Sequence, residues 1–195
     1  MLKIISAPNN ILRQTLEPVG KVNSKIIKII KDMELVLINQ KNPPGVGLAA
    51  NQVGINLRLF LALIDGYIVP FINPEIIKKS KELYPPQDGK NHLLEGCLSL
   101  HGYYGLVRRP KWIILKAITI DPNIPNIPNI PNNPSFFSLH TQKYTNFPAQ
   151  IIQHEIDHLN GHIFVEHVIA QKQKLYKIRD QDRKGKTVFE EVELT

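Results

Sequence analysis

One segment constrains the fold of this chain more than any other, the run from Gln153 to Gly161, which reads Gln-His-Glu-Ile-Asp-His-Leu-Asn-Gly. Pro148 suits the first turn of a helix and Gly161 suits its end. Apolar residues stand on several sides of such a helix: Ile151, Ile152, Ile156 and Leu159. Residues 148–160 are therefore expected to form a helix that the rest of the domain surrounds.

The remaining elements indicate the fold class. Asn23 and Ser24 can cap a helix over residues 23–40, where isoleucines recur at helical spacing. A third helix is expected from about Val165. Runs rich in β-branched residues predict strands, at 58–64, 67–72, 75–83, 112–120 and 135–141. Together they predict an α+β fold, with mixed or antiparallel β-sheets packed around the central helix.

The chain length of 195 residues fits a single domain spanning residues 1–195. Residues 121–134 contain Asn-Ile-Pro three times in succession and end in Asn-Asn-Pro. Proline removes backbone donors and asparagine favours turns, so an exposed loop between two strands is expected there. An insertion of this kind costs little stability because loop-closure entropy grows slowly with length.

Composition bounds the location and the partners. The apolar run before Pro8 is too short for a secretory signal, and no stretch approaches the length of a membrane span, so a cytoplasmic protein is expected. The single cysteine, Cys97, excludes an internal disulfide and fits a reducing compartment. A formal charge of +7 favours anionic partners without requiring one.

The central segment contains the pattern His-Glu-x-x-His. Residues four apart lie on the same helix face, so His154 and His158 can reach one metal ion. Glu155 stands beside the first ligand, where its carboxylate can accept a proton from water activated at the metal. The alternative is a pair of histidines on a solvated helix, which the surrounding apolar residues disfavour.

A catalytic site usually needs a third protein ligand. A zinc-protease arrangement would take it from downstream, where His162, Glu166 and His167 stand. The upstream candidate is Cys97, whose thiolate is a strong ligand for a borderline-soft divalent metal, although a lone cysteine is often only packed. These residues alone leave both choices open.

A third segment, Gly45-Val46-Gly47-Leu48-Ala49-Ala50-Asn51-Gln52, carries glycines that let backbone approach a ligand. The side-chain amide of Gln52 can donate to a carbonyl oxygen that gains charge. A simple turn between a helix and a strand explains the glycines nearly as well.

Taken together, three segments resemble the signatures of peptide deformylases, in the same order. They are Gly45 to Gln52, Glu95-Gly96-Cys97-Leu98-Ser99, and Gln153 to Leu159. The resemblance extends over roughly residues 4–168, interrupted by the Asn/Pro loop. It implies removal of the N-formyl group from the initiator methionine of newly made polypeptides.

The resemblance also implies a role for each matching residue. The metal ligands would be Cys97, His154 and His158, and Glu155 would be the acid/base. Gln52 and the backbone amide of Leu98 would polarise the formyl oxygen. Residues implied in substrate binding are Val46, Gly47, Leu93, Gly96, Phe147 and Ile151. The metal would be one divalent transition ion, Fe2+ foremost, with Zn2+, Ni2+ or Co2+ as alternatives. Glu95 and Arg109 match positions that would brace the Cys97 strand as a buried ion pair.

Two positions depart from the family pattern. His101 stands where many members have proline, and Tyr104 replaces an arginine often found there. Neither belongs to the implied ligand set, and His101 is interpreted as a surface residue.

Two rival functions remain: a zinc protease with a downstream third ligand, and a basic binding protein that has lost the activity of its relatives.

The C-terminal segment is strongly basic. Its cations are Lys172, Lys174, Lys177, Arg179, Arg183, Lys184 and Lys186. An apolar stripe from Val165 to Tyr176 predicts an amphipathic helix over about residues 165–186. Deformylases are known to use a basic C-terminal helix on the ribosome, so contact with ribosomal RNA is a further hypothesis beside the simpler one of a solvated helix.

Overall fold

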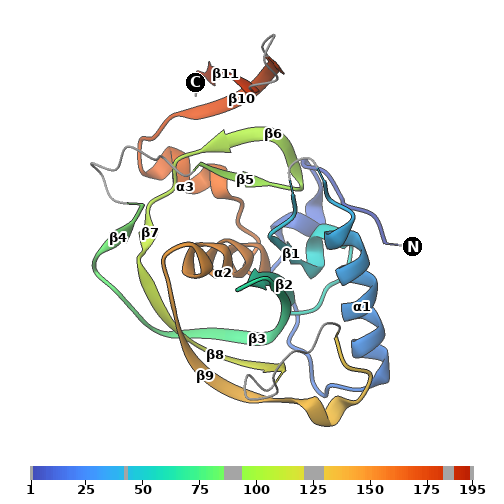
Figure 1. Cartoon of the computed structure of the whole chain (residues 1–195). Coiled ribbons are helices and arrows are strands. Elements are labelled where there is room, and N and C mark those ends of the chain that lie inside the picture. The colour runs from blue at the N-terminus through green and yellow to red at the C-terminus, as the bar shows by residue number, and fades with distance from the viewer. Residues whose placement is uncertain (1, 42–43, 86–93, 121–129, 182–186, 194–195) are drawn as a thin grey trace.

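The structure is a computed structural model that describes residues 2–41, 44–85, 94–120, 130–181 and 187–193. It confirms the α+β class, with antiparallel sheets around a central helix (Figure 1). The helices are η1 (Asn10–Arg13), α1 (Ser24–Ile38), η2 (Ala50–Val53), η3 (Pro134–Phe136), α2 (Asn146–Leu159) and α3 (Phe164–Ala170).

The strands form three antiparallel sheets among the described residues. A five-stranded sheet has the order β1 (Gly47–Ala49), β2 (Leu59–Ile64), β3 (Tyr67–Lys79), β8 (Trp112–Ile120), β9 (Phe137–Thr145). A four-stranded sheet has the order β11 (Thr187–Val192), β10 (Leu175–Gln181), β6 (Leu100–Gly105), β5 (Glu95–Cys97). A small sheet pairs β4 (Leu83–Tyr84) with β7 (Arg109–Pro110).

Helix α2 lies at the centre, with the five-stranded sheet curving around it and the four-stranded sheet on its other side (Figure 1). Its apolar side chains, Ile152, Ile156 and Leu159 among them, join the main core. Strand β8 shows why the sheet faces the helix: every second residue along it is buried. Gly161, with φ at +78°, ends the α2 turn in the left-handed region that the sequence assigns to glycine.

The sequence predicted most elements near their observed bounds. Asn23 caps α1 through a 3.1 Å hydrogen bond from the Ile26 amide to its side-chain oxygen. The separate strands predicted at 67–72 and 75–83 are largely joined in a single long strand, β3, which passes through Asn73 at a positive φ of 50°. The Asn73 side chain fixes this irregularity by accepting from the Val19 amide and donating to the Val19 carbonyl.

The predicted Asn/Pro loop connects β8 to β9, which pair directly from Trp112 opposite Thr145 to Ile120 opposite Phe137. Residues 121–129 lie outside the described residues. The last residues of the segment are described, and there Ile130 is buried at 2% exposure in the main core. The prediction of exposure is therefore wrong for Ile130, whose apolar side chain gains more from packing than from remaining in water.

The prediction of a basic helix over residues 165–186 is wrong beyond Ala170. Helix α3 ends there, Lys172 adopts a positive φ of 52°, and the chain continues as the hairpin of β10 and β11. The physical reason is that β6 offers an open edge, and β10 pairs with it from Leu175 opposite Gly105. Residues 182–186, with three of the seven cations, lie outside the described residues.

Candidate metal centre

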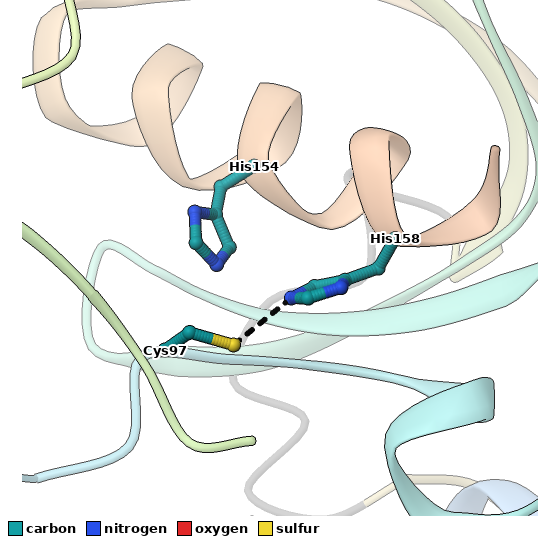
Figure 2. A group of neighbouring side chains, drawn as sticks. All are labelled: Cys97, His154 and His158. Carbon is teal, nitrogen blue, oxygen red and sulfur yellow. Dashed lines mark hydrogen bonds between the residues drawn. The ribbon is translucent and has the colours of Figure 1, made fainter. Parts of the chain in front are cut away.

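Two elements bring the predicted ligands together. His154 and His158 project from α2 one turn apart, and Cys97 reaches them from the end of β5 (Figure 2). Among the described residues these three form a cluster whose ligand atoms all lie within 4.8 Å of one another. The Cys97 Sγ atom lies 3.2 Å from His158 Nε2. Distances of this kind fit one ion held by a thiolate and two imidazoles, a donor set suited to transition metals.

The imidazole of His154 is oriented by a hydrogen bond on the side away from Cys97. Its Nδ1 lies 3.0 Å from Glu95 Oε2, so a carboxylate accepts the Nδ1–H and leaves Nε2 to face the cysteine side. Glu95 in turn receives two hydrogen bonds from Arg109, at 2.6 and 2.9 Å, and one from Gln150 at 2.9 Å. Arg109 also donates to Asp157 at 2.8 Å. The predicted Glu95–Arg109 ion pair is confirmed.

We expect the Glu95→Ala variant to lose about 3–5 kcal/mol of unfolding free energy, because it leaves the Arg109 guanidinium buried with one carboxylate fewer. Both side chains of this pair are buried, at 6% and 5% exposure. The matched control is Glu82→Ala, which breaks the exposed Lys111–Glu82 pair and should cost less than about 1 kcal/mol. Denaturant unfolding of both variants measures the difference, and equal small losses would dismiss the bracing role.

The charges of the site favour a thiolate. Burial opposes ionisation of Cys97, but His158 and His154 outweigh it, so the pKa of the Cys97 thiol lies well below its ordinary value. Burial likewise opposes the charged form of Glu95, yet Arg109 and His154 hold its pKa far below the usual range. The thiolate is the form of cysteine that binds metals.

The environment of Glu155 favours the neutral form of its carboxyl group, unlike that of Glu95. Burial raises its pKa to about 7, partly offset by the neighbouring His154 and His158. Its Oε2 atom is buried with no hydrogen-bond partner among the described residues. The other oxygen lies against Gly47, where an added Cβ would stand only 2.2 Å from it. Glycine is therefore required at position 47 to admit this carboxylate, which is free to exchange a proton near neutral pH.

A cavity of about 210 Å³ opens beside the cluster. It is bounded by β1 with its preceding turn, by β5, and by the first turns of α2. Its lining residues are Pro44, Gly45, Val46, Gly47, Gln52, Leu94, Glu95, Gly96, Cys97, Leu98, Tyr104, Phe147, Gln150, Ile151, His154 and Glu155. Two of the residues predicted for metal binding, catalysis or substrate binding are not among them: the ligand His158, which is fully buried, and Leu93, which lies outside the described residues.

Gln52 is fixed in a useful orientation. Its Oε1 accepts from the Ala49 amide at 2.8 Å, so its amide nitrogen faces the site, 3.3 Å from both Cys97 Sγ and Ser99 Oγ. A donor held in this way needs no reorganisation when charge develops on a substrate oxygen.

The two histidines considered as a downstream ligand lie elsewhere. His162 pairs with Glu166 at 2.7 Å on the surface, and His167 contacts Asp157 at 2.8 Å. Neither belongs to the ligand cluster, so the described residues do not support a downstream third ligand. His101 is exposed and is not among the cavity residues.

The sequence did not identify three residues that shape the site. Gln150 and Asp157 hold the Glu95–Arg109 pair, and Tyr104 lines the cavity. Asp157 stands inside the His-Glu-x-x-His pattern, and Gln150 lies one helical turn before His154. Their helical spacing could have indicated that both side chains lie near the metal ligands. For Tyr104, its place at a position where the family often has arginine could have indicated a role at the cavity.

Comparisons with known proteins agree with this site. The family model described as polypeptide deformylase matches residues 1–125 and 135–174. The peptide deformylase of Afipia carboxidovorans is 34% identical over 87% of this chain and 88% of its own length. That of Mesorhizobium japonicum is 33% identical over 95% and 97%.

Solved structures show the same fold. The peptide deformylase of Synechococcus elongatus in complex with actinonin superposes with a TM-score of 0.69 at 27% identity, covering 85% of this chain and 78% of that one. The enzyme of Legionella pneumophila gives 0.67 at 29% identity, covering 88% and 92%. This chain therefore belongs to the polypeptide deformylase family, the metal-dependent hydrolases that remove N-formyl groups from peptides.

Proposed function

We propose that this chain uses Fe2+ held by Cys97, His154 and His158 to deformylate the N-terminal methionine of newly made polypeptides, with Glu155 moving the protons. The observation that carries the proposal is the buried carboxylate of Glu155, with a pKa raised to about 7, directly beside the Cys97–His154–His158 cluster. The donor set accepts Zn2+, Ni2+ or Co2+ as well, while a soft thiolate excludes Mg2+ and Ca2+.

The bound ion would lower the pKa of water and polarise the formyl carbonyl. Glu155 would accept a proton from the attacking water and return it to the departing amine, so that formate and a free amino terminus are produced. Gln52 Nε2 and the Leu98 amide would donate to the oxygen of the formyl group as it gains charge. The fixed amide of Gln52 supports this assignment.

The peptide is expected to lie between two sheet edges. Strand β1 is the edge of one sheet and β5 the edge of the other, and both border the cavity. An extended peptide can add to such an edge through main-chain hydrogen bonds, with Gly47 and Gly96 allowing close approach. Val46, Phe147 and Ile151 would enclose the methionine side chain, and Leu93 is retained in this proposal from the family resemblance.

The proposed substrate class is tested by formate release from formyl-Met-Ala-Ser, compared with acetyl-Met-Ala-Ser as the matched acyl control. We expect release only from the formyl peptide, because a formyl carbon carries only hydrogen whereas an acetyl group adds a methyl group at the reacting carbon. Equal hydrolysis of both peptides, or of neither, would refute it.

We further propose that the basic C-terminal segment contacts ribosomal RNA, now through a hairpin instead of the predicted helix, in a cytoplasmic setting. No helix in the described residues is long and apolar enough to cross a membrane. Lys172, Lys177 and Arg179 are exposed, which supports the RNA contact. Ribosome co-sedimentation should fall steeply as salt rises, because phosphate contacts release counterions.

In that experiment the Lys172→Ala/Lys177→Ala/Arg179→Ala variant should sediment less than the parent. The matched control replaces Lys3, Lys25 and Lys28, exposed cations near the other end of the chain. If both triple variants sediment as the parent does, the hairpin does not dock on the ribosome.

A further inference from the structure

The hairpin of β10 and β11 extends the sheet that carries Cys97. The family model ends at residue 174, and both strands follow it. In Figure 1 they lie at the top of the molecule, along the edge of β6 that faces away from β5. The hairpin therefore widens the sheet whose other edge, β5, borders the cavity, and the matched residues do not supply this extension.

The two faces of this sheet differ. One face packs on α3, where Val107, Phe164, Val168 and Leu175 form a small core. On the other face a cross-strand row runs from Gly96 to Tyr104, Tyr176 and Glu191, each directly opposite the next. Because opposed residues in an antiparallel sheet point to the same side, this row faces the side on which Gly96 borders the cavity.

Gly96 is the reason that the row reaches the cavity. A Cβ at this position would lie 2.6 Å from the Tyr104 ring, so only glycine lets the ring lean over β5. Phe189 continues the aromatic surface: its ring centroid lies 5.5 Å from that of Tyr104 and 6.4 Å from that of Tyr176, both in edge-to-face geometry.

A second hollow lies over these rings, lined by Leu94, Leu106, Gln173, Lys174, Tyr176 and Phe189. Leu94 lines both this hollow and the cavity beside Cys97, so the two adjoin. At its rim Lys174 and Glu191 are paired at 2.7 Å, which leaves the rings as the main feature of the surface. Phe189 remains 42% exposed, so its ring is accessible to a ligand in the hollow.

We propose that this hollow is a subsite of the hairpin for a large apolar side chain in the downstream portion of the peptide substrate, a proposal that rests on the function proposed above. The hollow adjoins the cavity proposed for the formylated methionine instead of lying within it, so the subsite belongs to a residue further along the peptide. Because Tyr176 and Phe189 line the hollow, it favours aromatic side chains.

The test measures kcat/KM for formyl-Met-Ala-Ala-Ala-Ala and for three pentapeptides with phenylalanine at position 3, 4 or 5. Phenylalanine at one of these positions should raise kcat/KM about 5-fold, mainly through KM, because the contact is the same in ground and transition states. The ratio should fall to about 1 in Phe189→Ala and persist in Phe189→Tyr, which keeps the ring.

The matched control is Val188→Ala. Val188 is exposed to a similar degree, at 39%, and points to the opposite face of β11 by strand alternation, so this variant should keep the parent ratio. If formyl-Met-Ala-Ser is hydrolysed but phenylalanine gives no advantage, or Phe189→Ala keeps it, the subsite alone is overturned. If no formyl peptide is hydrolysed, the proposed function falls and the subsite falls with it.

Discussion

Replacing Cys97 with serine should abolish tight metal binding. The three ligands define the site, and the described residues hold no other cysteine, histidine or carboxylate in that cluster. Loss of a ligand should exceed the roughly 10- to 100-fold fall in affinity that loss of an outer partner costs. His154→Ala and His158→Ala should behave in the same way, and metal analysis after dialysis measures all three.

Ser99→Ala is the matched control for that series. Ser99 is buried near Cys97 and its Oγ lies 3.3 Å from Gln52 Nε2, yet it is outside the ligand cluster. We expect it to keep one ion per chain. Full metal occupancy in Cys97→Ser would show that the third ligand has been misassigned, and would revive the zinc-protease arrangement.

Replacing Glu155 should have a different effect, because its carboxylate moves protons and does not hold the ion. Glu155→Ala and Glu155→Gln should keep the metal and lose about 10²- to 10⁴-fold in kcat. Metal content and formate release, measured on the same preparation, separate the two effects. Glu166→Ala, which removes an exposed carboxylate of the neighbouring α3, serves as the control and should keep the parent rate.

Retention of more than about a tenth of the activity in Glu155→Gln would remove Glu155 from the role of acid/base, since general acid/base catalysis contributes at least about 100-fold. Loss of the metal together with the activity would instead make Glu155 a ligand.

The central site was predictable because its signals are local. His154 and His158 are one helical turn apart, and the apolar residues around them require a buried helix, so spacing alone placed both on one face. Cys97 needed the family resemblance, since residues alone left the upstream and downstream ligands open. The hydrogen bonds of Gln150 and Asp157 arise only when α2 packs on β5 and β7.

The C-terminal hairpin was not predictable by the same means. Five residues separate Ile169 from Leu175 in the expected apolar stripe, more than the spacing of one helix face allows, and Lys172 adopts a positive φ that ends the helix. What decides the strand is the free edge of β6, a tertiary feature that local propensity does not contain. The β-branched and aromatic residues Thr187, Val188, Phe189 and Val192 were the available signal for a strand.

Strand β3 shows a similar limit. Asn73-Pro74 is typical of a turn, so the sequence predicts two separate strands on either side of it. In the structure the Asn73 side chain holds Val19 from a distant segment of the chain, so the strand bends and continues.

The most direct test of the central claim is reconstitution of the metal-free protein. Protein stripped of metal should release no formate from formyl-Met-Ala-Ser, and anaerobic titration with Fe2+ should restore activity linearly until one ion is bound per chain. Cys97→Ser should gain none over the same range. Full activity in the metal-free protein, or restoration that is equal in Cys97→Ser, would contradict the assignment of Cys97, His154 and His158 as the centre of a metal-dependent deformylase site.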